Sequence, residues 1–150
     1  MNDIVVLVVK TVYLLLPAYI ANMAPVFNKY FWKKQTWYPL DFGIMWAGKR
    51  LLGSHKTWNG MIAGILAAVA MSYVQFLVSG FKWTSLNVLP YEQWLLIGVL
   101  FGIGALGGDA MKSFFKRRLS LKPGEIWVPF DQLDFIIGSL VLVSIIFPIP

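Results

Sequence analysis

Long apolar stretches separated by short charged ones run through the whole chain. No charged residue lies between Lys56 and Lys82, and this stretch exceeds the roughly 20 apolar residues that a helix needs to cross a bilayer. Comparable stretches occur on either side of it, and the four predicted membrane-spanning helices are 4–23, 58–79, 93–112 and 130–147. The pattern therefore predicts an all-α fold, a polytopic transmembrane helical bundle that forms a single domain over residues 1–150.

The composition agrees with this prediction. Hydrophobic residues make up 58% of the chain and charged residues only 13%, which is unusual for a soluble globular protein. A net charge of +6 would suggest nucleic-acid binding in a soluble protein. In a membrane protein it is better explained by loop charges that set topology and attract phosphates or anionic lipid headgroups. We therefore expect membrane lipids, and no nucleic acid, among the partners.

The distribution of the cations predicts the orientation. Every lysine and arginine except Lys10 and Lys82 falls in one of two loops, at about 25–57 and 112–129. Because cationic loops stay in the cytoplasm, both loops should be cytoplasmic and both termini outside, in a multi-pass protein of the cell membrane. Asn22, just before the first loop, either caps a turn of the chain or reaches a site at this edge.

Acidic and basic side chains gather where the third and fourth predicted helices meet the second loop. One helical face carries, at spacing i, i+3, i+4 and i+7, Asp109, Lys112, Ser113 and Lys116. Asp131 and Asp134 are spaced i, i+3 and share a face at the start of the fourth helix. Carboxylates at a membrane edge are costly unless paired, so a functional role is the first hypothesis.

Three carboxylates are suitable oxygen ligands for Mg²⁺, which keeps waters and substrate phosphates in its coordination shell. Nearby cations can hold a polyphosphate, and those expected to do so are Lys49, Arg50, Lys56, Lys112, Lys116 and Arg117. Carboxylates, a metal and cations together indicate phosphoryl or nucleotidyl transfer. The alternative is that the three aspartates only form ion pairs with neighbouring lysines and arginines.

Glycines and cations alternate over residues 48–57, just before the second predicted helix. This segment can present backbone N–H groups and lysines to phosphates, although it lacks the spacing of a P-loop. His55 has no second metal ligand nearby, so it either contacts a base or phosphate or lies on the loop surface. In the third helix Gly98 and Gly102 are expected to serve helix packing, whereas Gly108, next to Asp109, is a candidate site residue.

Two segments carry a resemblance to a known family. LDFGIMWAGKRLLGSHKTWNG and GGDAMKSFFKRRLSLKPGEIWVPFDQLDFIIG resemble the archaeal CDP-archaeol synthases, relatives of the CDP-diacylglycerol synthases, and the likeness covers about residues 22–138. The second segment is the more specific. The resemblance implies an integral membrane enzyme that transfers CMP from CTP to an isoprenoid ether-lipid phosphate (unsaturated archaetidic acid), releasing pyrophosphate with Mg²⁺.

The resemblance also implies roles for individual residues. The residues it places in catalysis are Asp109, Lys116, Asp131 and Asp134, of which the three aspartates would hold Mg²⁺. The residues it places around the triphosphate, the nucleotide or the lipid phosphate are Lys49, Arg50, Gly53, His55, Lys56, Thr57, Gly108, Lys112, Ser113 and Arg117. The two cytoplasmic loops would together form the nucleotide site.

The chain departs from the family in two respects. Asn59 stands where a basic residue is expected after the KTW sequence. The family usually continues into a fifth span, which implies either a longer parent chain or a lipid groove completed in another way.

The sequence disfavours two rival functions. The DGxxAR…GxxxDxxxD pattern of the CDP-alcohol phosphotransferases is absent, and a small cation channel or transporter with an acidic Mg²⁺ path is disfavoured by the adjacent basic cluster.

Overall fold

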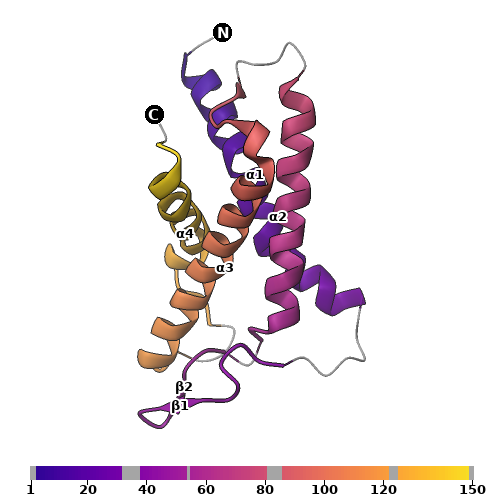
Figure 1. Cartoon of the computed structure of the whole chain (residues 1–150). Coiled ribbons are helices and arrows are strands. Elements are labelled where there is room, and N and C mark those ends of the chain that lie inside the picture. Colours follow the sequence, from indigo (N-terminus) through magenta and orange to yellow (C-terminus); the bar gives the residue numbers. More distant parts are fainter. Residues whose placement is uncertain (1–2, 32–37, 54, 81–85, 122–124, 149–150) are drawn as a thin grey trace.

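Four helices make up most of the molecule (Figure 1). The computed structural model describes residues 3–31, 38–53, 55–80, 86–121 and 125–148. The elements are α1 (Asp3–Phe31), β1 (Met45–Trp46), β2 (Lys49–Arg50), α2 (Trp58–Ser79), the 3-10 helix η2 (Tyr91–Gln93), α3 (Trp94–Arg118) and α4 (Phe130–Ile146). Figure 1 shows that α1 begins and α4 ends at one end of the molecule, whereas β1 and β2 lie at the opposite end.

Among the residues that the structure describes, three segments are long and apolar enough to cross a membrane: α1, α2 and the segment Tyr91–Arg118. Their outward faces carry exposed hydrophobic side chains such as Leu66, which is 62% exposed. The exposure of so much apolar surface to water would be unfavourable, so the chain is a membrane protein. The fourth helix, α4, has 17 residues and is not one of these three segments.

Two helices are longer than the sequence predicts. α1 continues through Pro25 to Phe31, and α3 continues past Lys112 to Arg118. A proline usually ends a helix because it lacks an N–H group, but here Pro25 packs at the crossing with α2, where a Cβ on Gly60 would lie 3.2 Å from Pro25 Cβ. The extension of α3 places Lys116, Arg117 and Arg118 of the second predicted loop on a helix.

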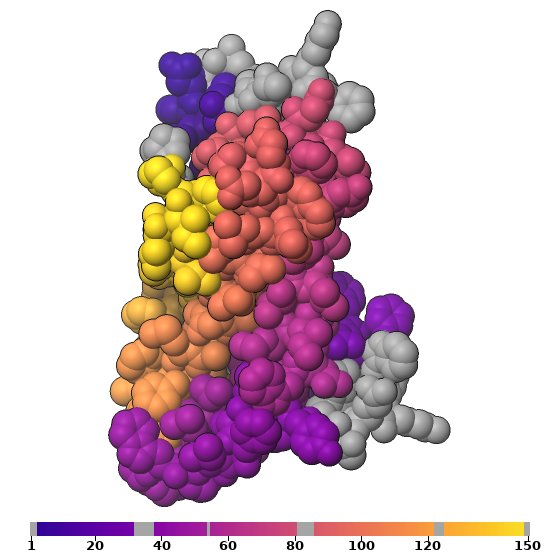
Figure 2. Space-filling view, in the orientation of Figure 1, coloured from indigo at the N-terminus to yellow at the C-terminus, as the bar shows by residue number. Residues whose placement is uncertain are grey.

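The first predicted loop contains a short β-hairpin, so the expectation of a purely helical chain was incomplete. Met45 pairs with Arg50 and Trp46 with Lys49. The two-residue turn between the strands requires positive φ at both positions, and Gly48 has φ 73°. Turns of this kind match the twist of the flanking strands. The space-filling view shows this purple segment covering one end of the helical column (Figure 2).

Glycines let α2 and α3 approach closely. A Cβ on Gly98 would lie 2.5 Å from Val69 Cα, and one on Gly102 would lie 2.8 Å from Ile65 Cα. Real Cβ atoms do not come so near to backbone, so only glycine fits at these two positions. The packing role that the sequence predicts for Gly98 and Gly102 is confirmed.

The contact between α3 and α4 is closer still. A Cβ on Gly108 would lie 2.1 Å from the carbonyl oxygen of Asp134, and one on Gly138 would lie 2.3 Å from the carbonyl oxygen of Gly104. The backbones of the two helices therefore touch without intervening side chains. The start of α4 is therefore held directly against α3.

Asp41 anchors the hairpin. Its carboxylate is almost fully buried and accepts hydrogen bonds from Arg50 Nη2 at 2.7 Å and from the backbone N–H groups of Gly43 and Leu52, each at 3.0 Å. Burial by itself raises the pKa of Asp41, but the hydrogen bonds from Arg50 and the two amides outweigh it and hold the pKa below its usual value. The hairpin is thus tied together through one ionised carboxylate.

The closeness of α3 and α4 can be tested by replacing Gly108 with alanine. The added methyl group would overlap the Asp134 carbonyl, so we expect Gly108→Ala to cost roughly 1–3 kcal/mol of stability and to lower the melting temperature in detergent. Gly107→Ala is the matched control, because nothing lies within 4 Å of a Cβ there. Equal melting temperatures for the two variants would contradict the close approach.

A second prediction concerns the dependence of the hairpin on pH. Because the folded-state pKa of Asp41 is lowered, its stabilising contribution is present above the unfolded pKa of about 3.9 and is lost as the pH falls through the lower folded value. The protection of the amides in residues 39–52 from hydrogen exchange, relative to their intrinsic rates, should therefore be high near neutral pH and fall in acid. In Asp41→Asn, exchange should be fast throughout. Slow exchange in this variant near neutral pH would refute the anchoring role.

Candidate functional site

Arg118, at the end of α3, docks the hairpin onto the helical bundle. Its Nη1 donates to the carbonyl of Trp46 at 2.6 Å and its Nη2 to the carbonyl of Arg50 at 2.8 Å. The guanidinium carbon lies 5.3 Å from the ring centroids of both Trp46 and Phe114, within the range of a cation–π contact. Lys49 Nζ in turn donates to the carbonyl of Arg118 at 3.4 Å. The hairpin cations are therefore fixed beside α3.

The segment after the hairpin is attached to the middle of the same helical face. The backbone N–H of Gly53 donates to Ser113 Oγ at 3.2 Å, and Lys56 Nζ forms an ion pair with Asp109. A Cβ on Gly53 would lie 3.2 Å from Ser113 Oγ, so a larger residue would press on this contact. These attachments bring the glycine-rich loop and the α3 face together, as the sequence predicts.

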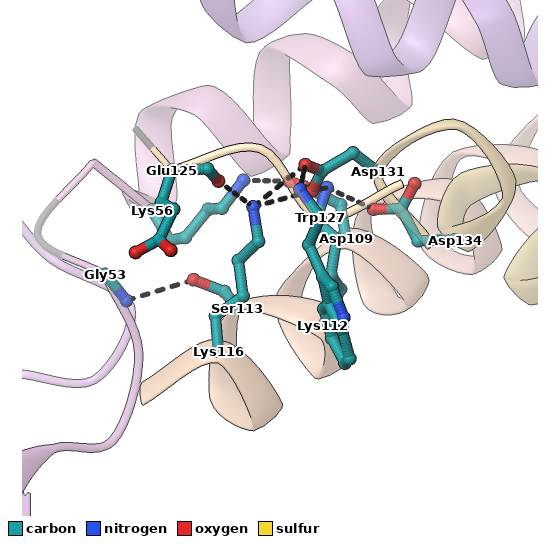
Figure 3. Close-up of polar contacts among 10 residues, drawn as sticks. All are labelled: Gly53, Lys56, Asp109, Lys112, Ser113, Lys116, Glu125, Trp127, Asp131 and Asp134. Carbon is teal, nitrogen blue, oxygen red and sulfur yellow. Dashed lines mark hydrogen bonds and ion pairs between the residues drawn. The ribbon is translucent and has the colours of Figure 1, made fainter. Parts of the chain in front are cut away.

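Lys112 lies among three carboxylates (Figure 3). Its Nζ is 3.2 Å from Asp109 Oδ1, 3.3 Å from Asp131 Oδ1 and 2.7 Å from Asp134 Oδ2. Asp109 comes from the same turn of α3, whereas the other two come from the first turns of α4. A single ammonium thus holds the acidic residues of both helices.

Lys116 provides a second cation one turn further along α3. Its Nζ lies 2.7 Å from Asp131 Oδ1 and donates to the carbonyl of Glu125 at 2.6 Å. The backbone N–H of Trp127 also donates to Asp131, at 2.6 Å. These contacts fix the segment that leads into α4 against the end of α3 (Figure 3).

The acidic cluster has the chemistry of a site for a hard divalent cation. Asp134 is the most buried of the three, with a side chain 5% exposed. Its Oδ2 lies 2.7 Å from Lys112 Nζ, whereas its Oδ1 has no hydrogen-bond partner among the described residues, and such buried oxygens are rare unless a ligand satisfies them. Within the described ranges, however, no three acidic or histidine side chains are already spaced to hold one ion. The Lys112 ammonium lies between them instead.

A cavity of about 650 Å³ opens beside this cluster. We call it the polar cavity, and its lining residues are Lys49, Arg50, Leu52, Gly53, His55, Lys56, Asp109, Lys112, Ser113, Lys116, Arg117, Ser120 and Leu121. Six of these side chains are lysines or arginines against one aspartate. A space of this size and charge suits a polyphosphate with an attached nucleoside.

Most of the predicted site residues line the polar cavity, and the rest lie close to it. Asp131 and Asp134 adjoin it through Lys112. The Thr57 side chain accepts the N–H of Gly60 and caps α2, so its hydroxyl is engaged in the helix start. Gly108 does not appear among the cavity-lining residues that the structure describes, and it packs against α4 instead.

The sequence did not single out two residues on which this geometry depends. Asp41 is not among the predicted site residues, and Arg118 is only one of the cations of the second predicted loop. Arg118 joins segments far apart in the chain, since it bonds to Trp46 and Arg50, whereas Asp41 bonds within its own loop to Gly43, Arg50 and Leu52. The one local signal for the role of Asp41 is the glycine two residues after it, Gly43, because an aspartate side chain commonly bonds to the backbone two residues on.

Comparisons with known proteins identify the family. The family model described as CarS-like, CDP-archaeol synthase, matches residues 4–150. A CDP-archaeol synthase of Thermofilum pendens is 38% identical over 95% of this chain and 65% of its own length, and one of Methanosphaerula palustris is 41% identical over 71% of this chain and 63% of its own. The chain thus spans just under two thirds of these relatives.

A solved structure is similar as well. It is described as an intramembrane enzyme for archaeal membrane lipids biosynthesis, and it superposes with a TM-score of 0.71 at 35% sequence identity. The match covers 87% of this chain and 73% of that one. Since the family model also covers nearly every residue, this chain belongs to the CDP-archaeol synthase family.

Proposed function

We propose that this protein transfers CMP from CTP to an isoprenoid ether-lipid phosphate, giving a CDP-lipid and pyrophosphate. The observation that carries the proposal is the polar cavity, which lies at the ends of membrane-type helices and places cations beside three carboxylates. This is the combination that nucleotidyl transfer to a membrane-bound acceptor requires. The names of the relatives, CDP-archaeol synthase, support the same substrate class.

We further propose that the protein crosses the cell membrane four times, with the polar cavity on the cytoplasmic side. Support comes from the position of α4, which returns the chain to the end where α1 begins (Figure 1). The cations of the hairpin and of the end of α3 lie together at the other end, and cationic ends favour the cytoplasm. CTP would then reach the cavity directly from water.

The reaction needs no general base in this scheme. A lipid phosphate oxygen, already ionised at neutral pH, forms a bond to the α-phosphorus of CTP, and the bond from that phosphorus to the bridging oxygen of pyrophosphate breaks. The electron pair leaves with pyrophosphate, so charge balances without a proton transfer. Lys49, Arg50 and Arg117 line the cavity where they can neutralise the triphosphate.

Mg²⁺ is the proposed metal, and Asp109, Asp131 and Asp134 are its proposed ligands. Their oxygens are the type that Mg²⁺ prefers, and the buried Oδ1 of Asp134, which accepts no hydrogen bond from the described residues, supports the assignment. When bound, Mg²⁺ would neutralise charge on the α-phosphoryl group and on the leaving pyrophosphate. Lys112, which now neutralises the three carboxylates, would then be available to phosphate oxygens.

A cation channel fits the site less well. A channel would present its carboxylates to the ion path, whereas Lys112 and Lys116 neutralise them here. Six lysines and arginines around the polar cavity would repel a cation. The site therefore favours an anionic substrate.

The activity can be tested with purified protein, labelled CTP, Mg²⁺ and either an ether- or an ester-linked lipid phosphate. We expect a labelled CDP-lipid with the ether substrate and stoichiometric pyrophosphate. We also expect CTP with Mg²⁺ to raise the melting temperature, because a ligand that binds only the folded state stabilises it. Metal flux into proteoliposomes without any nucleotide-induced stabilisation would favour the channel.

The metal ligands can be tested with Asp131→Asn and Asp134→Asn. Each should reduce Mg²⁺-dependent turnover by at least 100-fold, an order of magnitude typical for loss of a major electrostatic contribution, and should weaken the Mg²⁺-dependent part of the CTP stabilisation. Glu92→Gln, which changes an exposed acid at the opposite end of the molecule, is the control and should behave as wild type. Near-normal turnover in both aspartate variants would overturn the metal assignment.

A further inference from the structure

A second cavity lies on the other side of the Lys56–Asp109 ion pair. Its volume is about 420 Å³, and it is formed where α1, α2 and α3 meet. We call it the lateral cavity, and its lining residues are Asn22, Pro25, Val26, Lys29, Leu40, His55, Lys56, Thr57, Gly60, Met61, Leu106, Asp109 and Ala110. Asn22, for which the sequence left two roles open, therefore lies beside a cavity.

The two cavities have a common wall. His55, Lys56 and Asp109 line both of them, and Lys56 and Asp109 form an ion pair there. The side chains of this pair are only 28% and 14% exposed. A group bound in one cavity is therefore separated from a group in the other by little more than one ion pair.

The lining of the lateral cavity differs from that of the polar cavity. Lys29 and Lys56 supply positive charge, Asp109 is shared with the polar cavity, and most of the remaining lining is apolar. Lys29 makes no ion pair with any residue that the structure describes. A cation without a carboxylate partner, beside apolar walls, suits an amphiphile with an anionic head.

The position of the cavity fits the same kind of ligand. It lies against the last turns of α1, a membrane-type helix, where Val26 is 71% and Met23 49% exposed. Contacts such as the hydrogen bond from Asn28 Nδ2 to the carbonyl of Asn59, at 3.4 Å, hold α1 beside α2 at this level. An acyl or isoprenoid chain can follow the exposed apolar surface while its head enters the cavity.

We propose that the lateral cavity binds the phosphate head of the lipid acceptor, while CTP occupies the polar cavity. This inference rests on the proposed function and assigns a separate place to its second substrate. The new bond, from the lipid phosphate oxygen to the α-phosphorus, forms at the common wall near Lys56, and pyrophosphate leaves on the polar-cavity side. Entry from opposite sides gives the in-line arrangement of attacking and leaving oxygens that phosphoryl transfer requires.

Steady-state kinetics with two lysine variants test this assignment. Lys29→Gln should raise KM for a short-chain ether-lipid phosphate about tenfold, equivalent to about 1.4 kcal/mol of binding, and should leave KM for CTP and the CTP-induced rise in melting temperature unchanged. Lys49→Gln, in the polar cavity only, should show the reverse pattern. Lys10→Gln, on the same helix as Lys29 but outside both cavities, is the matched control and should change neither constant.

The outcomes separate this inference from the proposed function. If wild-type protein neither forms a CDP-lipid nor is stabilised by CTP, the function itself fails, and this assignment fails with it. If wild-type protein is active but Lys29→Gln leaves the lipid KM unchanged, only the lateral cavity is misassigned. A change in inhibition by added pyrophosphate, without a change in the lipid KM, would instead make the cavity an exit for the product and would overturn the proposal.

Discussion

The neutralisation of three carboxylates by lysine ammonium groups is the interaction on which the rest of the site depends. Near a protein surface two opposite charges 4 Å apart attract by about 4 kcal/mol, whereas one unpaired carboxylate at a membrane edge is costly. Lys56, Lys112 and Lys116 each lie against at least one of the aspartates. These ion pairs also cross-link α3, α4 and the loop before α2. The charged side chains proposed to act in the reaction therefore also hold these segments together.

The ion pairs between α3 and α4 form where the backbones of these two helices come close. Gly108 lies against the carbonyl of Asp134, and this contact brings the first turn of α4 within reach of the lysines on α3. Further along, Gly104 and Gly138 make the same kind of contact. Since a membrane offers little hydrophobic driving force between helices, small residues and buried charges must together supply the specificity of packing.

The sequence was most informative where the relevant distances are local. The spacing i, i+3 correctly predicts that Asp131 and Asp134 share a helical face, and the membrane-type length of α2 follows from an uncharged stretch. Contacts between distant segments could not be predicted from the sequence. Nothing in a single sequence shows that Arg118 bonds to Trp46, or that Lys112 rather than solvent lies between the acids. The predicted end of the first helix before Pro25 was wrong, because the packing partner of Pro25, Gly60, is on another helix.

The unequal packing on the two sides of the site has a mechanical consequence. On one side, α3 and α4 touch backbone to backbone at Gly108, so the pair forms a stiff unit that cannot slide without a steric clash. On the other side, the loop before α2 is attached to α3 through side chains, including the Lys56–Asp109 ion pair and the hydrogen bond from Gly53 to Ser113. Any movement of the structure as substrates bind and leave is therefore concentrated in the loop before α2, while α3 and α4 hold the carboxylates in fixed positions.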